Sequence, residues 1–234
     1  MIAAQNLTYS YDDHTVIDDL SLSIPAGEFC LLVGPNGSGK TTLVRQFNAL
    51  LEPDSGTVTV DGTDVTENPV VARTSVGMVF QQPRDQFVAA TVGADVAFGP
   101  ENLGLERADI DRRVEEALAA VDLDGREDER LDELSGGEQT RVAIAGALAM
   151  EPDYLILDEP LVGLDWPARK SVLAQLDRLH AEGTTLVVVT HDLRDLHERA
   201  DRLVGLRDGR VVLDDEPATA LDGVTDLGVR DPRC

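Results

Sequence analysis

The sequence predicts an α/β fold with a helical insertion, and three observations support that prediction. Residues 29–33, 154–157 and 185–189 are short, nearly all-apolar runs, which are typical of parallel strands covered on both faces. A glycine-rich segment follows the first of these runs and precedes a helical pattern. Between about residues 91 and 150 the apolar spacing is helical, which indicates an inserted helical part.

The expected core combines residues 1–83 with residues 153–215, and the helical part spans about residues 84–152. Residues 2–33 alternate apolar and polar in short runs, which predicts an antiparallel β hairpin region leading into the strand at 29–33. The other elements expected of the core are a helix at 41–51, strands at 57–60 and 76–80, and a short strand after residue 211, followed by a polar tail over 222–234.

Helical periodicity is clearest at residues 108–121, where Ile110, Val114, Leu118 and Val121 recur at spacings of four and three. The acidic run at 125–133 is expected to be a solvated loop. A further helix is expected to open at Ser135, because a capping residue there precedes a new apolar pattern.

The composition is strongly acidic. Asp and Glu total 44 against 20 Lys and Arg, a formal net charge of -24, and the only lysines are Lys40 and Lys170. Because 42% of the residues are hydrophobic, we interpret this charge as an acidic surface adapted to high salt, not as disorder. Retained folding and activity in dilute buffer would contradict that hypothesis. No basic stripe exists to neutralise phosphates along a strand, so direct binding of nucleic acid is not expected.

Cys30 and Cys234 do not form a disulfide framework, which fits a reducing compartment. The first residues lack the layout of a signal peptide. No apolar run approaches the roughly 18 residues that a membrane-spanning helix requires. We therefore expect any membrane role to depend on a partner.

The glycine-rich segment has the pattern of a phosphate loop. Its glycines allow backbone N–H groups to surround phosphate oxygens, and the helix that follows adds its positive N-terminal end. Lys40 is expected to contact the β- and γ-phosphates, and the Thr41 hydroxyl is expected to bind Mg²⁺. The expected nucleotide-binding residues are Gly34, Pro35, Asn36, Gly37, Ser38, Gly39, Lys40, Thr41 and Thr42.

Polar residues follow the other predicted parallel strands. Asp158 and Glu159 end the apolar run at 154–157, and His191 follows the run at 185–189. Ligands of parallel sheets bind outside the carboxyl ends of their strands, where these residues meet the phosphate loop. A buried carboxylate is costly without a partner, so we expect Asp158 to meet Mg²⁺ and Glu159 to polarise the attacking water.

Residues 135–138, Ser-Gly-Gly-Glu, form a second polar segment at a helix start. With Ser135 as the capping residue and Glu138 three positions later, the pattern is that of a capping box. A helix N-terminus also attracts anions, so local capping does not exclude a functional role.

The phosphate loop, Leu134-Ser135-Gly136-Gly137-Glu138-Gln139 and Leu155-Ile156-Leu157-Asp158-Glu159, in that order, resemble the ATP-binding subunit of ABC (ATP-binding cassette) proteins. The resemblance covers about residues 2–221, so residues 1–221 are expected to form one ATP-binding domain. It implies a P-loop NTPase (RecA-like) core, an antiparallel β subdomain and an inserted helical subdomain. It also implies ATP and Mg²⁺ as cofactors, and ATP hydrolysis as the reaction.

The resemblance assigns further roles. Residues 135–138, the signature segment, are expected to bind the γ-phosphate of ATP held by a second ATPase subunit, and Asp165 is expected at that two-fold interface. By the same resemblance, His191 contacts the γ-phosphate and Gln81 reaches Mg²⁺ and the attacking water. Tyr11 resembles the aromatic residue that stacks on adenine, with Tyr9 or simple packing on the core as alternatives. Glu138 stands where glutamine is commoner, and Leu161 and Val162 are bulkier than usual.

Residues 81–105 and 141–150 resemble the ATPases of energy-coupling factor (ECF) importers, which take up vitamins and cobalt or nickel ions. In that family the segment after Gln81 receives a helix of the membrane subunit. Asp85 is the candidate acidic contact, whereas Arg84 stands where an acidic residue is frequent. Phe87, Val88 and Val92 are expected to supply the apolar lining.

The implied partners are a second ATPase subunit, identical or a paralogue, an integral membrane transport subunit and a substrate-binding membrane subunit. The chain is then expected at the cytoplasmic face of the cell membrane. A non-transport ABC ATPase, for instance of the iron–sulfur assembly type, would share every catalytic motif and differ in its partner surface. A nucleotide sensor without hydrolysis is a third reading, which intact Lys40, Glu159 and His191 disfavour.

Overall fold

The computed structural model describes residues 1–233, so Cys234 lies outside the described residues. The strands are β1 (Ile2–Tyr11), β2 (His14–Ile24), β3 (Phe29–Val33), β4 (Ser55–Val60), β5 (Thr63–Asp64), β6 (Val76–Val79), β7 (Tyr154–Asp158), β8 (Thr185–Thr190), β9 (Arg202–Arg207) and β10 (Arg210–Asp215). The α-helices are α1 (Lys40–Phe47), α2 (Pro69–Ser75), α3 (Val92–Asn102), α4 (Arg107–Ala120), α5 (Gly136–Leu148), α6 (Trp166–Ala181) and α7 (Pro217–Ala220). Short 3₁₀ turns occupy η1 (Pro83–Gln86), η2 (Leu131–Glu133) and η3 (Val224–Leu227).

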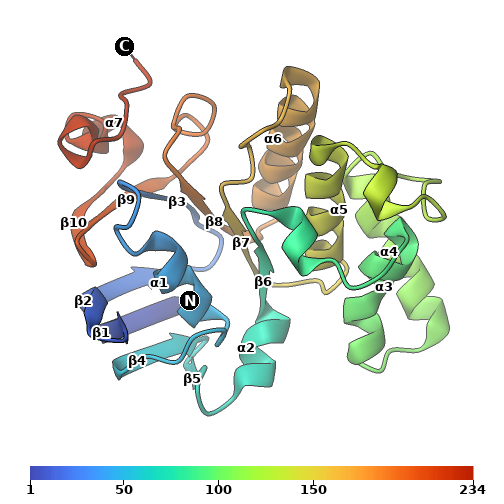
Figure 1. The fold of residues 1–234 in the computed structure, drawn as a ribbon, viewed down its shortest axis with the longest axis horizontal. Coiled ribbons are helices and arrows are strands. Elements are labelled where there is room, and N and C mark those ends of the chain that lie inside the picture. Colours follow the sequence, from blue (N-terminus) through green and yellow to red (C-terminus); the bar gives the residue numbers. More distant parts are fainter. Residues whose placement is uncertain (234) are drawn as a thin grey trace.

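Two sheets organise these elements (Figure 1). The smaller sheet is antiparallel, with strand order β2-β1-β4-β5. The larger sheet has the order β10-β9-β3-β8-β7-β6, and all its neighbours pair in parallel except β10 with β9. Every residue of β3, β7 and β8 is buried, which confirms the prediction of parallel strands covered on both faces.

Alternating side chains of β3 belong to two separate cores. Phe29, Leu31 and Val33 join the core that also contains apolar residues of α5 and α6. Cys30 and Leu32 point the other way, into the core shared with α1 and the antiparallel sheet. This alternation follows from the two-residue period of a strand, and it holds α1 against the sheet at the point where β3 ends.

Helix α1 ends at Phe47, earlier than the expected end at residue 51. Ala49 has a left-handed backbone conformation (φ 56°), which an α-helix cannot contain. The N–H groups of Leu50 and Leu51 both donate to the carbonyl oxygen of Arg45, which closes the last turn. The apolar pattern alone did not reveal this reversal of the chain.

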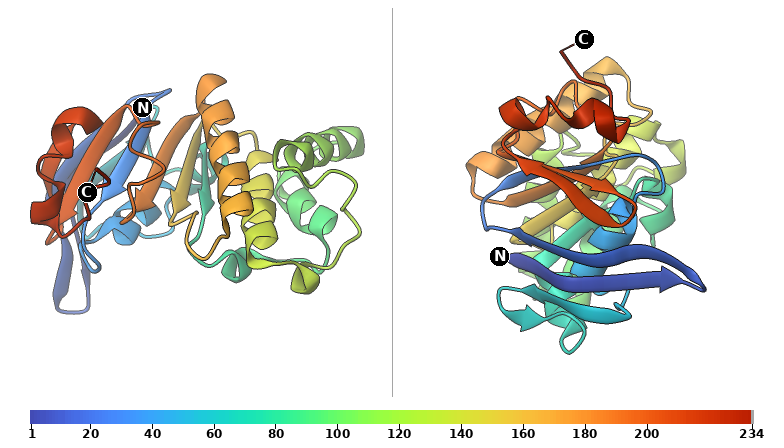
Figure 2. Two further views of the ribbon diagram at one scale, coloured as in Figure 1. Left: turned by 90° about the horizontal axis from the view of Figure 1, so that it is seen from above. Right: turned by 90° about the vertical axis from the view of Figure 1, so that its left-hand side faces the viewer.

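The helical insertion lies beyond the edge strand β6, where Figure 2 (left) shows the green and yellow-green helices gathered at one end of the molecule. Ile110, Val114 and Leu118 are buried as their spacing predicted. The acidic loop is less solvated than expected, because Leu131 is buried within it. Among residues 1–233, no helix combines the length and the apolar character that crossing a membrane would require.

The polar tail after residue 222, whose order the sequence left open, packs against the core for most of its length. Helix α7 lies beside β10 (Figure 1), and Val224, Leu227 and Val229 are buried in the larger core. A Cβ placed on Gly205 of β9 would lie 2.4 Å from the Leu227 side chain, so the segment packs directly on that strand. Three apolar residues gathered on one face are enough to fix a segment whose composition is mainly polar.

Candidate functional site

The phosphate loop joins β3 to α1, and its backbone shows why glycine is required. Gly34 and Gly39 have φ angles of 149° and 98°, which side chains rarely allow. A Cβ on Gly34 would lie 2.1 Å from the carbonyl oxygen of Leu206, and one on Gly39 would lie 2.8 Å from that of Val16. Gly39 precedes α1 without a side-chain cap, so the first N–H groups of the helix remain available to a ligand.

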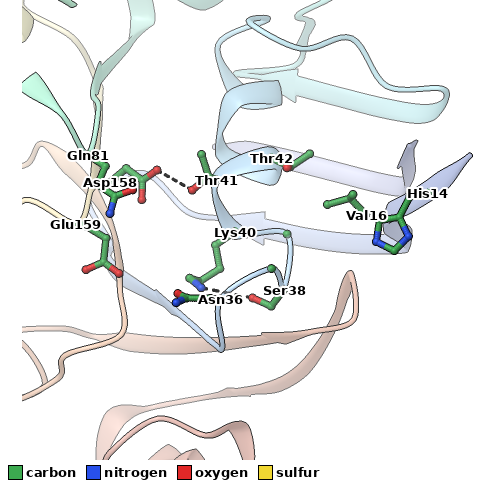
Figure 3. A pocket seen from close by; sticks show the side chains of 12 residues that line it. His14, Val16, Asn36, Ser38, Lys40, Thr41, Thr42, Gln81, Asp158 and Glu159 are labelled. Atoms are coloured by element: carbon green, nitrogen blue, oxygen red, sulfur yellow. Dashed lines mark hydrogen bonds between the residues drawn. The ribbon is translucent and has the colours of Figure 1, made fainter. Parts of the chain in front are cut away.

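A cavity of about 300 Å³, the nucleotide pocket, opens beside this loop (Figure 3). It brings together residues from the β1–β2 hairpin, the phosphate loop and the ends of β6 and β7. Its lining residues are His14, Val16, Asn36, Gly37, Ser38, Gly39, Lys40, Thr41, Thr42, Gln81, Asp158 and Glu159. Gly34 and Pro35 are not among them and lie behind Lys40 as its hydrogen-bond acceptors.

Lys40 is buried, and its ammonium donates to the carbonyl oxygens of Gly34 and Pro35 at 2.8 and 2.9 Å. Burial lowers the pKa of this ammonium, whereas the charges of Glu159 and Asp158 oppose that shift. The cation is thus partly desolvated and faces the pocket (Figure 3). Such an ammonium is well placed to attract an anion.

Asp158 ends β7 and is 3% exposed. The Thr41 hydroxyl donates to its Oδ2 at 2.7 Å (Figure 3). Burial raises the pKa of this carboxyl, although the Thr41 hydrogen bond lowers it. A hydroxyl and a carboxylate oxygen side by side fit a magnesium ion, which prefers one or two protein oxygens together with phosphate oxygens. The described residues hold no group of three or more His, Cys, Asp or Glu suited to a metal.

Glu159 lies in the left-handed region (φ 53°), an uncommon conformation for a residue other than glycine. Its Oε1 lies 2.5 Å from Nδ1 of His191, and the Thr190 hydroxyl donates to its Oε2 at 3.3 Å. Glu159 lines the pocket, whereas His191 is largely exposed and reaches the pocket through this contact. Strain and two partners fix the direction of the carboxylate, as expected for a reactive group.

Gln81 follows β6 and lines the pocket beside Asp158 and Glu159 (Figure 3). The phosphate loop, Gln81, Asp158 and Glu159 therefore converge on one pocket, although the sequence separates the first and last of them by more than a hundred residues.

At the far end of the pocket, the lining residues are His14 and Val16, which sequence reasoning did not select. His14 pairs with Tyr11 across the β1–β2 hairpin, so only the strand register could have revealed it. Tyr11 is 44% exposed, and its ring packs edge-on to Tyr9 with centroids 5.0 Å apart. The assignment of Tyr11 to adenine stays a prediction. Of the other histidines, His180 pairs with Asp201, and His197 bonds to the Leu193 carbonyl oxygen.

The signature segment opens α5 with the predicted capping box. The Ser135 side chain accepts from the Glu138 N–H, and the Glu138 carboxylate accepts from the Ser135 N–H at 2.8 Å. Arg126 donates to the other Glu138 oxygen at 2.6 Å. The hydrogen bond from Ser135, followed by that from Arg126, lowers the pKa of Glu138 to about 2.

The signature segment shares no lining residue with the nucleotide pocket. Ser135 and Glu138 instead line a separate cavity of about 320 Å³, together with Asp165. Asp165 caps α6 by accepting from the Ala168 N–H at 3.0 Å. A Cβ on Gly137 would lie 2.7 Å from Ala168, whereas one on Gly136 would meet nothing within 4 Å. Gly137 thus serves helix packing, and Gly136 leaves an open backbone surface.

Asp85 lies in η1 and is exposed, away from both cavities. Val88 is 59% exposed nearby, and Phe87 is partly buried. Val92 is fully buried in the core, so the expectation that it lines an outer groove is wrong. As the first residue of α3, it points toward the other helices instead.

Known protein families and individual relatives match this chain over most of its length. The family described as ABC transporter matches residues 17–162. A putative ABC transporter ATP-binding protein of Halobacterium salinarum is 61% identical over 99% of this chain and 100% of that protein. The cobalt import ATP-binding protein CbiO of Syntrophus aciditrophicus is 44% identical (94% of this chain, 80% of that one), and an energy-coupling factor ATP-binding protein EcfA2 of Clostridium tetani is 41% identical (97% and 82%).

Solved structures of ABC transporter ATPases also match the fold of this chain. CbiO1 of Clostridium perfringens, part of the ABC transporter complex cbiONQ, aligns with a TM-score of 0.85 at 34% identity, over 99% of this chain and 96% of that one. The dimeric ATP-binding cassette MJ0796, bound to ADP and Pi after hydrolysis, aligns with a TM-score of 0.84 at 29% identity, over 93% and 99%. The predicted fold and the predicted resemblance to ABC and ECF ATPases are confirmed. The chain therefore belongs to the ABC transporter family, as one of its ATP-binding, ATP-hydrolysing subunits.

Proposed function

We propose that this chain powers an importer of the ECF type, from the cytoplasmic face of the cell membrane, and that the cargo is a cobalt or nickel ion or a vitamin. One observation carries the proposal: the chain matches CbiO1, part of the cbiONQ complex, over 99% of its length. Relatives named for cobalt import and for energy coupling support the same transporter class.

We assign the pocket residues different roles in hydrolysis. Lys40 and the N–H groups at the start of α1 hold the phosphates and neutralise their charge. Glu159 orients a water toward the terminal phosphate and accepts its proton, and His191 keeps that carboxylate in line through the 2.5 Å contact. Gln81 lies beside both acidic residues, where it can hold the same water.

Thr41 and Asp158 are the residues that would hold Mg²⁺. Their oxygens already lie 2.7 Å apart, and burial raises the pKa of the carboxyl, which a bound cation would offset. When bound, the cation would neutralise the charge that the phosphate oxygens gain during transfer.

We further infer that two copies, or this chain and a paralogue, act together. Since no residue of the signature segment lines the chain's own nucleotide pocket, its open Gly136 surface fits a nucleotide held by another subunit. The similarity to a dimeric cassette supports this arrangement. Its symmetry would place each signature segment on the other subunit's pocket.

The surface after Gln81 is the proposed contact with the membrane subunit. Asp85 is exposed there. The same segment, residues 81–105, also contains three exposed large apolar side chains: Val88 (59% exposed), Phe98 (45%) and Leu103 (37%). Exposed apolar residues and a carboxylate within one segment suit a helix that carries a basic residue.

Affinity purification of this chain from its native membranes at high salt, with mass spectrometry of the bound proteins, tests the proposal. Recovery of a small integral membrane subunit with a substrate-binding membrane protein is expected. Recovery of soluble assembly factors alone would keep the ATPase chemistry and overturn the transport role. Asp85→Arg should lose the membrane partner at unchanged basal hydrolysis. Asp226→Arg, an equal charge change in η3 at the opposite end of the molecule, should retain it.

A further inference from the structure

Arg84 connects two segments that the chain separates by 55 residues. Its Nε donates to Oε1 of Gln139 at 2.9 Å. Arg84 belongs to η1, just after Gln81, whereas Gln139 lies in the first turns of α5, just after the signature segment. One hydrogen bond thus joins the loop that reaches the nucleotide pocket to the helix that presents the signature segment.

Gln139 is a fixed acceptor on the α5 side. It is 4% exposed, and its amide donates to the carbonyl oxygens of Leu131 and Leu134 at 3.0 and 3.2 Å. These bonds use both N–H donors of the amide and hold its oxygen toward η1. A movement of Gln139 therefore carries along the loop immediately before Ser135.

On the η1 side, two internal hydrogen bonds hold residues 80–86 in a closed loop. The side chain of Gln86 accepts from the Phe80 N–H at 2.9 Å, and the Asp85 N–H donates to the Gln82 carbonyl oxygen at 3.1 Å. Arg84 and Gln81 both lie inside this closed stretch. A displacement of Gln81 by a nucleotide would therefore move Arg84 as well.

The contact is not a tightly packed interface. Gln81, Arg84, Gly136 and Gln139 all line one cavity of about 230 Å³, which also reaches Glu159. The hydrogen bond is a direct link between two walls of this cavity. The carboxylate of Asp132 in η2 also attracts the Arg84 guanidinium.

We propose that Arg84 is a positioning residue that couples the nucleotide pocket at Gln81 to the signature segment through Gln139. The inference rests on the proposed two-subunit function. Occupation of one pocket would adjust, through this link, the signature segment that completes the other subunit's site. Arg84, which departs from the acidic residue frequent in ECF ATPases, thereby gains a role of its own in this chain.

The test uses the full chain in a Glu159→Gln background, so that bound ATP persists. Binding of a fluorescent ATP analogue to the monomer and ATP-driven dimerisation by analytical ultracentrifugation are measured separately. Arg84→Met should leave nucleotide affinity within about twofold and weaken dimerisation about 5- to 10-fold, the effect expected for one charge-assisted hydrogen bond. With Glu159 restored, kcat should fall by a similar factor at unchanged KM. Arg84→Lys, which keeps a donor, should recover part of both losses.

The controls separate the possible failures. Arg112→Met removes an exposed arginine of α4 that pairs with Glu116, and it should change neither quantity. Gln139→Leu combined with Arg84→Met should dimerise no worse than Gln139→Leu alone. Unaltered dimerisation and kcat in Arg84→Met would overturn the coupling, and so would weakened nucleotide binding by the monomer. If the parent protein did not dimerise with ATP, the two-subunit proposal itself would fall, and the coupling with it.

Discussion

The N-termini of α1 and α5 carry the phosphate loop and the signature segment, for which we propose a second phosphate contact, and they are built differently. Gly39 starts α1 without a side-chain cap, and buried Lys40 and Asp158 surround the opening. At α5, Ser135 and Glu138 cap one another, and Arg126 holds the carboxylate. The first site thus keeps an uncapped helix start and two buried charged groups for a ligand, whereas the second is complete as local structure.

This difference indicates which of the two sites would gain free energy when a nucleotide binds. Burial without a full partner shifts the pKa of Lys40 and of Asp158 toward the neutral forms, so a nucleotide with its cation would relieve both. The charged groups of the signature segment are already paired, so a nucleotide would not change their ionisation in this way. Its contribution to binding depends on a ligand that contacts the open backbone at Gly136. Substitutions at the first site should therefore affect chemistry and stability together, and those at the second should separate them.

Glu159→Gln should have the largest effect. A neutral amide cannot accept the proton of the attacking water, so kcat should fall by about 10²- to 10⁴-fold. Binding of ATP should persist, and an ATP-bound dimer should accumulate in sedimentation experiments. Glu67→Gln, an equivalent change on an exposed residue, should hydrolyse ATP normally. Ordinary turnover in Glu159→Gln would remove Glu159 from its role.

Gly136→Ala should separate activity from stability. The added methyl meets no atom of the chain within 4 Å, so the melting temperature should hardly change. A nucleotide held by another subunit would have to approach that backbone, and kcat should drop about 5- to 150-fold, as overpacking of about 1–3 kcal/mol implies.

Gly137→Ala supplies the contrast within the same segment. Its methyl would lie 2.7 Å from Ala168, so this variant should lose about 1–3 kcal/mol of stability before any ligand is added. Full activity in Gly136→Ala would show that no ligand approaches that surface.

Asp158→Asn should abolish hydrolysis yet stabilise the nucleotide-free protein by about 1 kcal/mol, or about 2–4 °C in melting temperature. The reason is the buried carboxylate, whose ionisation the folded state disfavours. Because the folded pKa is raised, the folded state binds more protons, and wild-type stability falls as pH rises from 3.8 through the raised value.

Calorimetry across that pH range measures this difference between the variant and the wild type. The advantage of the variant should be full at neutral pH and should vanish in acid. Addition of Mg²⁺ with ATP should stabilise the wild type and leave Asp158→Asn almost unchanged. A variant that melts earlier than the wild type at neutral pH would show that the carboxylate is well paired without a ligand.

The sequence was sufficient where function depends on consecutive residues. The phosphate loop, the Asp158-Glu159 pair and the capping box at Ser135 each lie within a short segment, and their strands were evident from unbroken apolar runs. The meeting of β3, β7 and β8 at one edge followed from the rules of parallel sheets.

Features that depend on the tertiary register could not be predicted. His14 reaches the pocket because the β1–β2 hairpin pairs it with Tyr11, and polar neighbours in the sequence gave no sign of this. Leu227 is buried because it meets Gly205 of β9. The bond between Arg84 and Gln139 joins residues 55 positions apart, which no periodicity reports.

Glu138→Gln should have the smallest effect and tests the second site alone. The Gln oxygen can still accept from the Ser135 N–H and hydroxyl, but its NH₂ then faces Arg126, so the charge-assisted contact is lost. A loss of about 0.5–1 kcal/mol is expected at neutral pH, as for a partly exposed ion pair. Glu133→Gln, in the loop before the segment, should cost less.

The pH dependence identifies the cause of that loss. The pKa of Glu138 is lowered in the folded state, so its stabilisation is complete above pH 4.5 and disappears as the pH falls toward about 2. The stability difference between the wild type and Glu138→Gln should shrink over that same interval. A difference independent of pH would assign the cost to the shape of the capping box, because the glutamine has no charge to lose. Retained hydrolysis at neutral pH would then show that α5 can present Ser135 and Gly136 without the Arg126 contact, which leaves the approach of the second subunit as the step that this site controls.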